Sequence, residues 1–244
     1  MKLLQLLALI TLISCSTTPS ADEIVNYAIK ASGTERLRNA EASFTFRNIQ
    51  YEYLHRNGNY RYTRIQTDSV GNEVKDVLVN SGLSRFINNT LVDIEEKKRA
   101  AYTSSVNSVI YFGFLPLPLN DAAVNKSYVG EATINQKNYY KIKVTFDVQG
   151  GGEDYEDVFY YWFDKEDFSM DYLAYSYNED DGIGVRFREA YNARIVNGVV
   201  VQDYRNYRPE NEENFPLETI DDAFTEGTLK LLSVIELEDV RIGF

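Results

Sequence analysis

Few residues in this sequence could carry nucleophilic or acid–base chemistry. The 244 residues include one histidine, His55, and one cysteine, Cys15. A serine–histidine–aspartate triad would have to be built on His55. That residue lies just before Asn57-Gly58, a dipeptide typical of a tight β-hairpin turn, so we expect it to be a solvated residue near a strand end. A single cysteine cannot form a disulfide within the chain, so Cys15 needs another explanation.

Cys15 follows a segment that is typical of a secretion signal. Lys2 supplies a positive charge and residues 3–13 are mainly apolar, but this segment is shorter than the roughly 20 apolar residues of a membrane-spanning helix. The stretch Leu-Ile-Ser-Cys that ends at Cys15 resembles the lipobox of bacterial lipoproteins. The resemblance implies that residues 1–14 are removed, that Cys15 is lipidated, and that residues 15–20 form a tether. The alternative is a spare cysteine at the end of an ordinary signal peptide.

The residues after the cysteine indicate a membrane leaflet. In the enterobacterial sorting rule an aspartate after the cysteine retains a lipoprotein at the inner membrane, so Ser16 favours the outer membrane. Export to the cell surface commonly uses acidic residues directly after the cysteine, whereas the first acids here are Asp22 and Glu23. We therefore expect a lipid anchor in the periplasmic leaflet of the outer membrane, with the cell surface as the alternative.

Acidic side chains gather in one glycine-rich turn. They are Glu153, Asp154, Glu156 and Asp157. Clustered carboxylates suit hard cations such as Ca²⁺, but the spacing of an EF-hand is absent, so a solvated hairpin is the simpler interpretation and a metal site the weaker one. As a glycosidase pair these acids would need to oppose one another across a cleft, which spacing alone does not show. We therefore expect no metal and no cofactor.

Two other short patterns offer little chemistry. Lys141 and Lys143 alternate within a predicted strand, and neither a βα repeat nor a sequence motif supports the Schiff-base lysine of a deoxyribose-phosphate aldolase. Asp68-Ser69-Val70 resembles the three-residue O-glycosylation motif of periplasmic Bacteroidetes proteins, which would place a glycan on Ser69. Neither pattern indicates an enzyme.

Net charge limits the partners. The chain has 37 acidic and 25 basic residues, which gives a formal charge of −12 at pH 7. Such a surface disfavours nucleic acid, whose phosphates need a basic face, and it disfavours electrostatic docking to anionic lipid headgroups. Membrane attachment should therefore come from the lipid anchor. We expect a monomer.

The elements that must position these residues are mostly short strands. From Glu41 onward the period of the apolar residues changes from 3.6 to 2, and we count about eleven strands joined by hairpin-length turns. No βαβ alternation is present, and a flat sheet of this many strands should curl or split. We predict one mainly β domain over residues 21–244, an unclosed and strongly curled antiparallel β-barrel with helical lid elements.

Three helices are predicted beside the strands. The first spans residues 20–32, where Ser20 and Glu23 fit a capping box. The second spans residues 95–114 and ends where prolines follow. The third is a short helix over residues 218–226.

Aromatic rings occupy one face of several predicted strands. Side chains alternate across a strand, so each set would line one side of the sheet. The candidate cavity residues are Phe44, Phe46, Tyr51, Tyr53, Phe86, Val144, Phe146, Phe159, Tyr161, Phe163, Tyr175 and Tyr177. Such rings would accept an apolar chain. The alternative is that they pack against the helices.

The longest apolar run after the signal segment spans residues 108–120. We interpret it as a lid, or as a loop facing a membrane or partner, over the barrel opening. The alternative is a buried helix end packed across the same opening. The candidate lid residues are Val109, Ile110, Phe112, Phe114, Leu115 and Leu117.

Two stretches resemble the periplasmic lipoprotein carriers and receptors of the LolA/LolB superfamily. Gly130, Glu131 and Tyr140 match a hairpin of that superfamily, and Trp-Phe-Asp-Lys at residues 162–165 matches the turn that follows it. The resemblance implies an unclosed β-barrel with a helical lid that holds acyl chains. Over almost the whole mature chain the sequence looks closer still to a family of Bacteroidetes lipoproteins whose molecular function is not established. The superfamily's carriers are soluble, so a lipidated Cys15 would exclude a freely diffusing shuttle.

These observations predict an outer-membrane-anchored lipoprotein that binds an apolar ligand, a lipid or a lipoprotein acyl chain, in a half-barrel cavity. A structural or interaction lipoprotein with a filled barrel is the alternative, and an enzyme of unknown type is the third. An aromatic-lined cavity of several hundred Å³ would favour binding, and a packed interior would exclude it.

Overall fold

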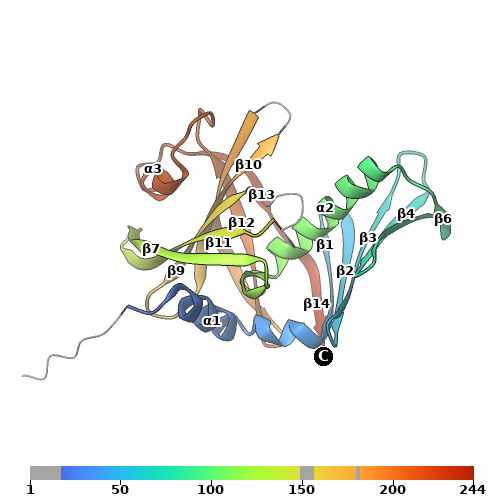
Figure 1. Cartoon of the computed structure of the whole chain (residues 1–244), viewed down its shortest axis with the longest axis horizontal. Helices are drawn as coiled ribbons and strands as arrows, with labels where there is room; N and C mark the ends of the chain where they lie inside the picture. Colours follow the sequence, from blue (N-terminus) through green and yellow to red (C-terminus); the bar gives the residue numbers. More distant parts are fainter. Residues whose placement is uncertain (1–17, 149–156, 180–181) are drawn as a thin grey trace, which may run out of the picture.

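The strands form two antiparallel sheets that the C-terminal segment links along one side (Figure 1). The structure, a computed structural model, describes residues 18–148, 157–179 and 182–244. Sheet A has the strand order β14-β1-β2-β3-β4-β5-β6, and sheet B has the order β13-β12-β11-β10-β9-β8-β7. The predicted mainly β, antiparallel architecture is confirmed. The predicted number of strands is wrong, because the described residues form fourteen strands instead of about eleven.

The bounds of the strands follow the chain. In sheet A they are β1 Ala40–Phe46, β2 Ile49–Arg56, β3 Asn59–Thr67, β4 Glu73–Val79, β5 Gly82–Ile87, β6 Thr90–Val92 and β14 Glu238–Gly243. In sheet B they are β7 Val124–Ile134, β8 Lys137–Phe146, β9 Val158–Asp164, β10 Met170–Glu179, β11 Gly182–Val196, β12 Val199–Arg208 and β13 Lys230–Ile235. Consecutive strands pair with one another from β1 to β6 and from β7 to β12. At the β2–β3 turn Asn57 and Gly58 both adopt positive φ, as an Asn-Gly turn requires.

The C-terminal segment accounts for part of the difference in strand number. Its sequence predicts one closing strand, but the segment bends at Leu237, so that β13 pairs with β12 and β14 pairs with β1. The side chain of Leu237 is buried, and its backbone N–H donates a hydrogen bond of 3.0 Å to Asp203 Oδ1. One continuous stretch of chain therefore carries the β-structure from sheet B into sheet A.

The barrel is open on the opposite side. Within the described residues, β6 and β7 each pair with one strand only, so they are the outer edges of the two sheets. Helix α2, Glu96–Gly113, connects these edges and crosses the space between the sheets (Figure 1). The unclosed, curled arrangement predicted from the sequence is confirmed.

The first helix, α1, spans Ala21–Ser32 and has the predicted boundaries. Ser20 caps it: its hydroxyl accepts from the Glu23 N–H, and the Glu23 carboxylate accepts from the Ser20 N–H at 2.8 Å. Gly33 ends the helix with φ of +68°. These contacts satisfy backbone groups that a helix end leaves unpaired.

The remaining helices are short. They are α3 Ile220–Thr225 and the 3₁₀ helices η1 Thr34–Asn39, η2 Leu117–Asn120 and η3 Leu217–Thr219. The element α3 falls within the predicted helix at 218–226. No helix of the described residues is long and apolar enough to cross a membrane.

Three hydrophobic clusters hold these elements together. The largest lies between the sheets and takes side chains from α1, both sheets and the end of α2. The second lies on the outer face of sheet B, where Trp162 and Phe187 pack beneath α3. The third joins Val106 of α2 to Leu78 and Leu83 of sheet A. Sheet B is therefore covered on both faces, and we call the face toward α2 its inner face.

Candidate functional site

The inner face of sheet B carries a cross-strand row of apolar side chains. Val144, Phe159 and Tyr175 are direct neighbours on β8, β9 and β10. The rings of Phe159 and Tyr175 stack with centroids 5.2 Å apart. Alternation along each strand adds Phe146 and Tyr177 to the same face. This row provides one wall of the interior.

Much of the interior is filled by packed side chains. Seven of the candidate cavity residues are buried in the largest cluster: Phe44, Tyr51, Tyr53, Val144, Phe159, Tyr161 and Phe163. The hydroxyls of Tyr111 and Tyr161 lie 3.1 Å apart, and burial raises the pKa of both phenols above the ordinary value, so the two hydroxyls stay protonated and hydrogen-bonded. These residues contribute core packing.

The candidate lid residues lie on the last turns of α2 and on the chain that follows. Ile110, Phe114, Leu115 and Leu117 are buried between the sheets. Val109 and Phe112 are only partly buried and face open space. This placement corresponds to a buried helix end packed across the opening, which was the alternative to an exposed loop.

Two pockets remain open beside the end of α2, each of about 310 Å³. Four residues line both of them: Ser108, Phe112, Tyr175 and Tyr177. The first pocket continues to Phe146 and Phe159, and we call it the aromatic pocket. The second continues to Phe46, Val109, Gln202, Tyr204, Ile235 and Leu237, and we call it the arginine pocket because Arg188 also lines it. Each volume lies near the lower end of the range for small-molecule sites, about 300–1,000 Å³.

Arg188 gives the arginine pocket its electrostatic character. The residue is 8% exposed, and it is the only charged residue among those that line this pocket. Its Nη2 donates a hydrogen bond of 2.6 Å to the hydroxyl of Tyr175. Its Cζ lies 4.0 Å from the centroid of the Phe112 ring, which is a cation–π contact. Tyr204 in the same wall has its pKa raised to about 12, with burial as the largest cause.

Several candidate residues lie away from these pockets. Phe86 faces the other side of β5, because its neighbours Leu83 and Arg85 contact α2. Ser69 is exposed in the β3–β4 turn, where the Asp68 carboxylate accepts from backbone N–H groups.

Of the candidate metal ligands, Asp157 is buried and lines the aromatic pocket. The candidate ligands Glu153, Asp154 and Glu156, and the lipidation candidate Cys15, lie outside the described residues. No group of at least three His, Cys, Asp or Glu side chains in the described part of the chain could hold a metal ion.

His55 is not the solvated hairpin residue that the sequence predicts. Its ring stacks on Tyr53 at 5.0 Å, and its Nε2 lies 2.9 Å from the hydroxyl of Tyr62. Burial lowers its pKa, and the positive charge of Arg38 lowers it further. The adjoining pocket has a volume of only about 80 Å³, which is too small for an organic substrate. We assign His55 to packing.

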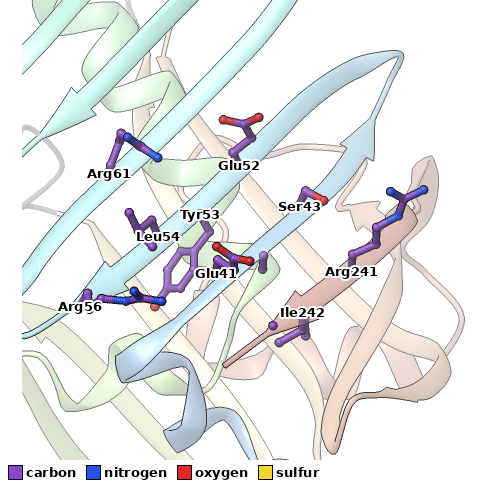
Figure 2. A pocket seen from close by; sticks show the side chains of 11 residues that line it. Glu41, Ser43, Glu52, Tyr53, Leu54, Arg56, Arg61, Arg241 and Ile242 are labelled. Atoms are coloured by element: carbon purple, nitrogen blue, oxygen red, sulfur yellow. The ribbon is translucent and has the colours of Figure 1, made fainter.

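A further hollow, of about 640 Å³, is a groove on the outer face of sheet A (Figure 2). Charged side chains line it, among them Glu52 on β2, Arg61 on β3 and Arg241 on β14. The groove is open to water, and ionic contacts between exposed groups are weak. Several aromatic rings line each of the two interior pockets, whereas Tyr53 is the one ring that lines the groove, so the interior pockets are the stronger candidate site.

Arg188, Gln202 and Tyr204 were missed in the sequence. The sequence feature that could have indicated Arg188 is the stretch Arg-Phe-Arg at 186–188. Phe187 packs on the outer face of sheet B. Strict alternation then sends both arginines toward the interior. A strand that is buried on both faces and still carries arginine on one of them indicates a polar site.

The fold and the two pockets define a class of protein: an open antiparallel half-barrel with a helix across its interior and a small aromatic-lined site beside that helix. Within this class, the chain belongs to DUF6503, a family of unknown function whose sequence profile matches residues 2–237. No curated protein matches the sequence.

Solved structures with a similar arrangement differ strongly in sequence. A LolA superfamily protein from Nitrosomonas europaea shares 10% identity with a TM-score of 0.47, and the alignment covers 92% of this chain and 94% of that one. A DUF1329 family protein from Desulfovibrio piger shares 11% identity with a TM-score of 0.44, covering 92% and 93%. A domain from Vibrio parahaemolyticus described as an outer membrane lipoprotein-sorting protein shares 8% identity with a TM-score of 0.41, covering 91% and 93%. At these values none of the three assigns a function to this chain.

Proposed function

We propose that this protein is a lipid-anchored envelope protein that binds an apolar ligand, a lipid or a lipoprotein acyl chain, in the two pockets beside α2. The observation that carries the proposal is the pair of aromatic-lined spaces of about 310 Å³ each, which share four lining residues. The ring of Phe112 lines both pockets, and the rings of Phe146 and Phe159 add apolar surface to the aromatic pocket. Apolar surface of this kind gains free energy when a ligand removes it from water.

The proposal also includes the anchor. Lipidation of Cys15 would hold the protein at the periplasmic leaflet of the outer membrane, and the ligand would come from that bilayer or be delivered to it. Two or three acyl chains give stable attachment, because each buried CH₂ contributes about 0.8 kcal/mol.

The experiment is native mass spectrometry of the processed protein purified from its host. We expect a co-purifying lipid with the wild type. In the Ser108→Trp variant, the indole would occupy space in both pockets, and we expect the lipid to be lost. Lys97→Trp places the same ring on an exposed position of α2 and serves as the matched control.

A second candidate, a structural or interaction lipoprotein with no ligand, is favoured by the packed rings of Phe44, Tyr161 and Phe163. The experiment separates the two functions. If no lipid co-purifies, and alkyl probes neither bind nor respond to Ser108→Trp, the binding function is excluded and the structural one remains. Circular dichroism of each variant shows whether the fold is intact.

A further inference from the structure

Arg188 is a buried cation with no counter-charge among the residues that the structure describes. Arg64 and Arg188 are the two arginines with buried side chains, at 7% and 8% exposure. Arg64 pairs with Asp76 at 2.6 Å, whereas Arg188 forms no ion pair with any described residue. A buried charge normally requires a partner, because leaving water is unfavourable for an ion. An unpaired arginine is notable in a chain with a net charge of −12.

The hydrogen bonds of Arg188 are also incomplete. Its Nη2 donates to Tyr175, but its Nε–H is buried and donates to no described group. Asn206 is the direct cross-strand neighbour of Arg188, and its Oδ1 is likewise buried without a hydrogen bond. Asn206 Nδ2 donates to Ser233 at 3.3 Å.

The surroundings of Arg188 combine one charge with apolar walls. Phe112 and Tyr175 contribute cation–π contacts at 4.0 and 5.1 Å, which offset part of the charge without accepting a hydrogen bond. Ser108, Gln202 and the tyrosine hydroxyls are the neutral polar groups of the wall, and no acidic residue is among those that line this pocket. The site therefore has room for an acceptor of negative charge next to an apolar chain.

We propose that the ligand is a single-chain amphiphile with an anionic head group, and that Arg188 binds this head group. The inference rests on the proposed function and specifies its ligand. The head group occupies the arginine pocket, and the alkyl chain passes Phe112 into the aromatic pocket. A carboxylate or a phosphate supplies the acceptors that Arg188 lacks, since guanidinium pairs with both. Two pockets of about 310 Å³ each suit one chain better than a lipid with several.

The experiment uses three photoreactive probes with the same 16-carbon chain and the same terminal diazirine: an alkyl carboxylate, an alkyl phosphate and an alkyl alcohol. The processed protein from its host is irradiated with each probe, and labelled peptides are mapped by mass spectrometry. We expect labelling at peptides of α2 and β9–β11. We expect the anionic probes to bind about ten- to a hundredfold more tightly than the alcohol, the range for a hydrogen bond to a charged group. Preference between carboxylate and phosphate identifies the natural head group.

Variants test the role of Arg188. In Arg188→Met, which keeps an unbranched side chain, we expect the preference for anionic probes to disappear while labelling by the alcohol is retained. Arg188→Lys keeps the charge and should retain part of the preference. Arg61→Met removes an arginine from the outer groove and serves as the control for net charge. The retained alcohol labelling shows that the Arg188→Met pocket is folded.

The results separate the two proposals. If all three probes label the pocket equally in the wild type and in Arg188→Met, the head-group inference is wrong and the apolar-binding function stands. If no probe labels the pocket in the wild type, both proposals fail.

Discussion

The guanidinium of Arg188 lies against the ring of Phe112, with Cζ 4.0 Å from the ring centroid. Arg188 belongs to β11 of sheet B and Phe112 to the last turns of α2. The same ring lines both interior pockets. Phe112 therefore covers the cation and lies between the two spaces, and both properties depend on how α2 is held between the sheets.

Replacing Phe112 by alanine should widen the passage between the two pockets. We expect Phe112→Ala to bind long alkyl chains better relative to short ones, because the combined space accepts more of the chain. We also expect a loss of about 2–3 kcal/mol in the free energy of unfolding, below the 3–5 kcal/mol of a fully buried ring because Phe112 is partly exposed. Displacement of a fluorescent fatty acid by fatty acids of about 10–18 carbons, a size range suited to pockets of a few hundred Å³, measures the first effect. Urea unfolding measures the second.

Phe86→Ala is the matched control, because that ring lies on the opposite side of β5 from α2. It should lower stability to a smaller extent and leave the dependence on chain length unaltered. An equal dependence on chain length in Phe112→Ala and the wild type would show that Phe112 does not limit the length of the bound chain.

Asp76 should be the most sensitive charged position of sheet A. Its carboxylate is fully buried and pairs with Arg64 and Arg85, both at 2.6 Å. Arg64 also donates to Ser105 of α2 at 2.7 Å, so this network positions the helix. Asp76→Asn leaves two arginines without a counter-charge, and we expect the free energy of unfolding to fall by about 3–5 kcal/mol. Urea denaturation measures the change.

Glu73→Gln provides the comparison for Asp76. Glu73 pairs with Lys75 at 3.6 Å, and its side chain is half exposed. Exposed ion pairs contribute less than about 1 kcal/mol to the free energy of unfolding, so we expect Glu73→Gln to lower it by no more than this amount. A similar small loss in both variants would show that the Asp76 network contributes no more than a surface ion pair.

Local elements of this fold could be predicted and long-range ones could not. The capping box at Ser20 and the turn at Asn57-Gly58 depend on a few neighbouring residues, and both are present. The bend at Leu237 depends on Asp203 in another strand, so the sequence of the segment alone predicts one strand instead of two. The alternation of side chains along β5 could be predicted, but the face of Phe86 could not, because the position of α2 decides which face of the strand is interior.

The candidate site could be predicted in part: the sequence indicates which rings face inward, but it does not indicate the shape or the charge of the pockets. Alternation identifies the inward set of rings, such as Phe159 and Tyr175, from the strands alone. It does not show how much of the space the end of α2 fills. Arg188 was missed because its importance lies in what surrounds it, an apolar pocket without an acid, and this depends on contacts between distant segments.

The stability should depend on pH through His55, the only histidine of the chain. Burial, and then the charge of Arg38, lower the pKa of His55 in the folded state. In the window between this lowered pKa and the unfolded value near 6.5, the unfolded state binds more protons, so stability rises with pH and is lost as pH falls. Urea unfolding between pH 7.5 and 5.5, about one unit on either side of 6.5, should show this loss.

His55→Phe should reduce that dependence. The variant keeps a ring beside Tyr53 but cannot be protonated, so its stability should change less over the same pH range than that of the wild type. Loss of the contact with the Tyr62 hydroxyl lowers its stability equally at all pH values and leaves the slope interpretable. A slope as steep as that of the wild type would assign the pH dependence to other groups.

Gly33 should not tolerate a side chain. It ends α1 with φ of +68°, and a Cβ there would collide with the carbonyl oxygen of Gly198 in the β11–β12 turn. We expect Gly33→Ala to lower the free energy of unfolding by about 2–5 kcal/mol, the sum of the left-handed backbone and the overpacking. Gly227→Ala is the control, with φ of +71° and open space around it, and should lose about 1 kcal/mol. Thermal unfolding of the two variants compares them, and equal losses would show that α1 does not require this close contact.

Cys15→Ser should abolish the proposed anchor. We expect the variant to accumulate as an unprocessed precursor that takes up no radiolabelled fatty acid, whereas Ser16→Ala is processed and labelled like the wild type. Because the chain has one cysteine, the mature wild-type protein should also be unreactive toward a thiol reagent after denaturation. Normal acyl labelling of Cys15→Ser would contradict the lipidation.

The length of the proposed tether connects the anchor to the site. Residues 15–20 extend over at most about 20 Å, so a lipidated Cys15 would keep α1 within that distance of the bilayer surface. An alkyl chain released from the same leaflet would then have a short path to the pockets. Lengthening the tether by a flexible insert of about 20 residues, roughly 25 Å in root-mean-square span, should leave anchoring intact. We expect it to lower the amount of lipid that co-purifies, as native mass spectrometry would measure, and an unaltered amount would show that ligand loading does not depend on proximity to the membrane.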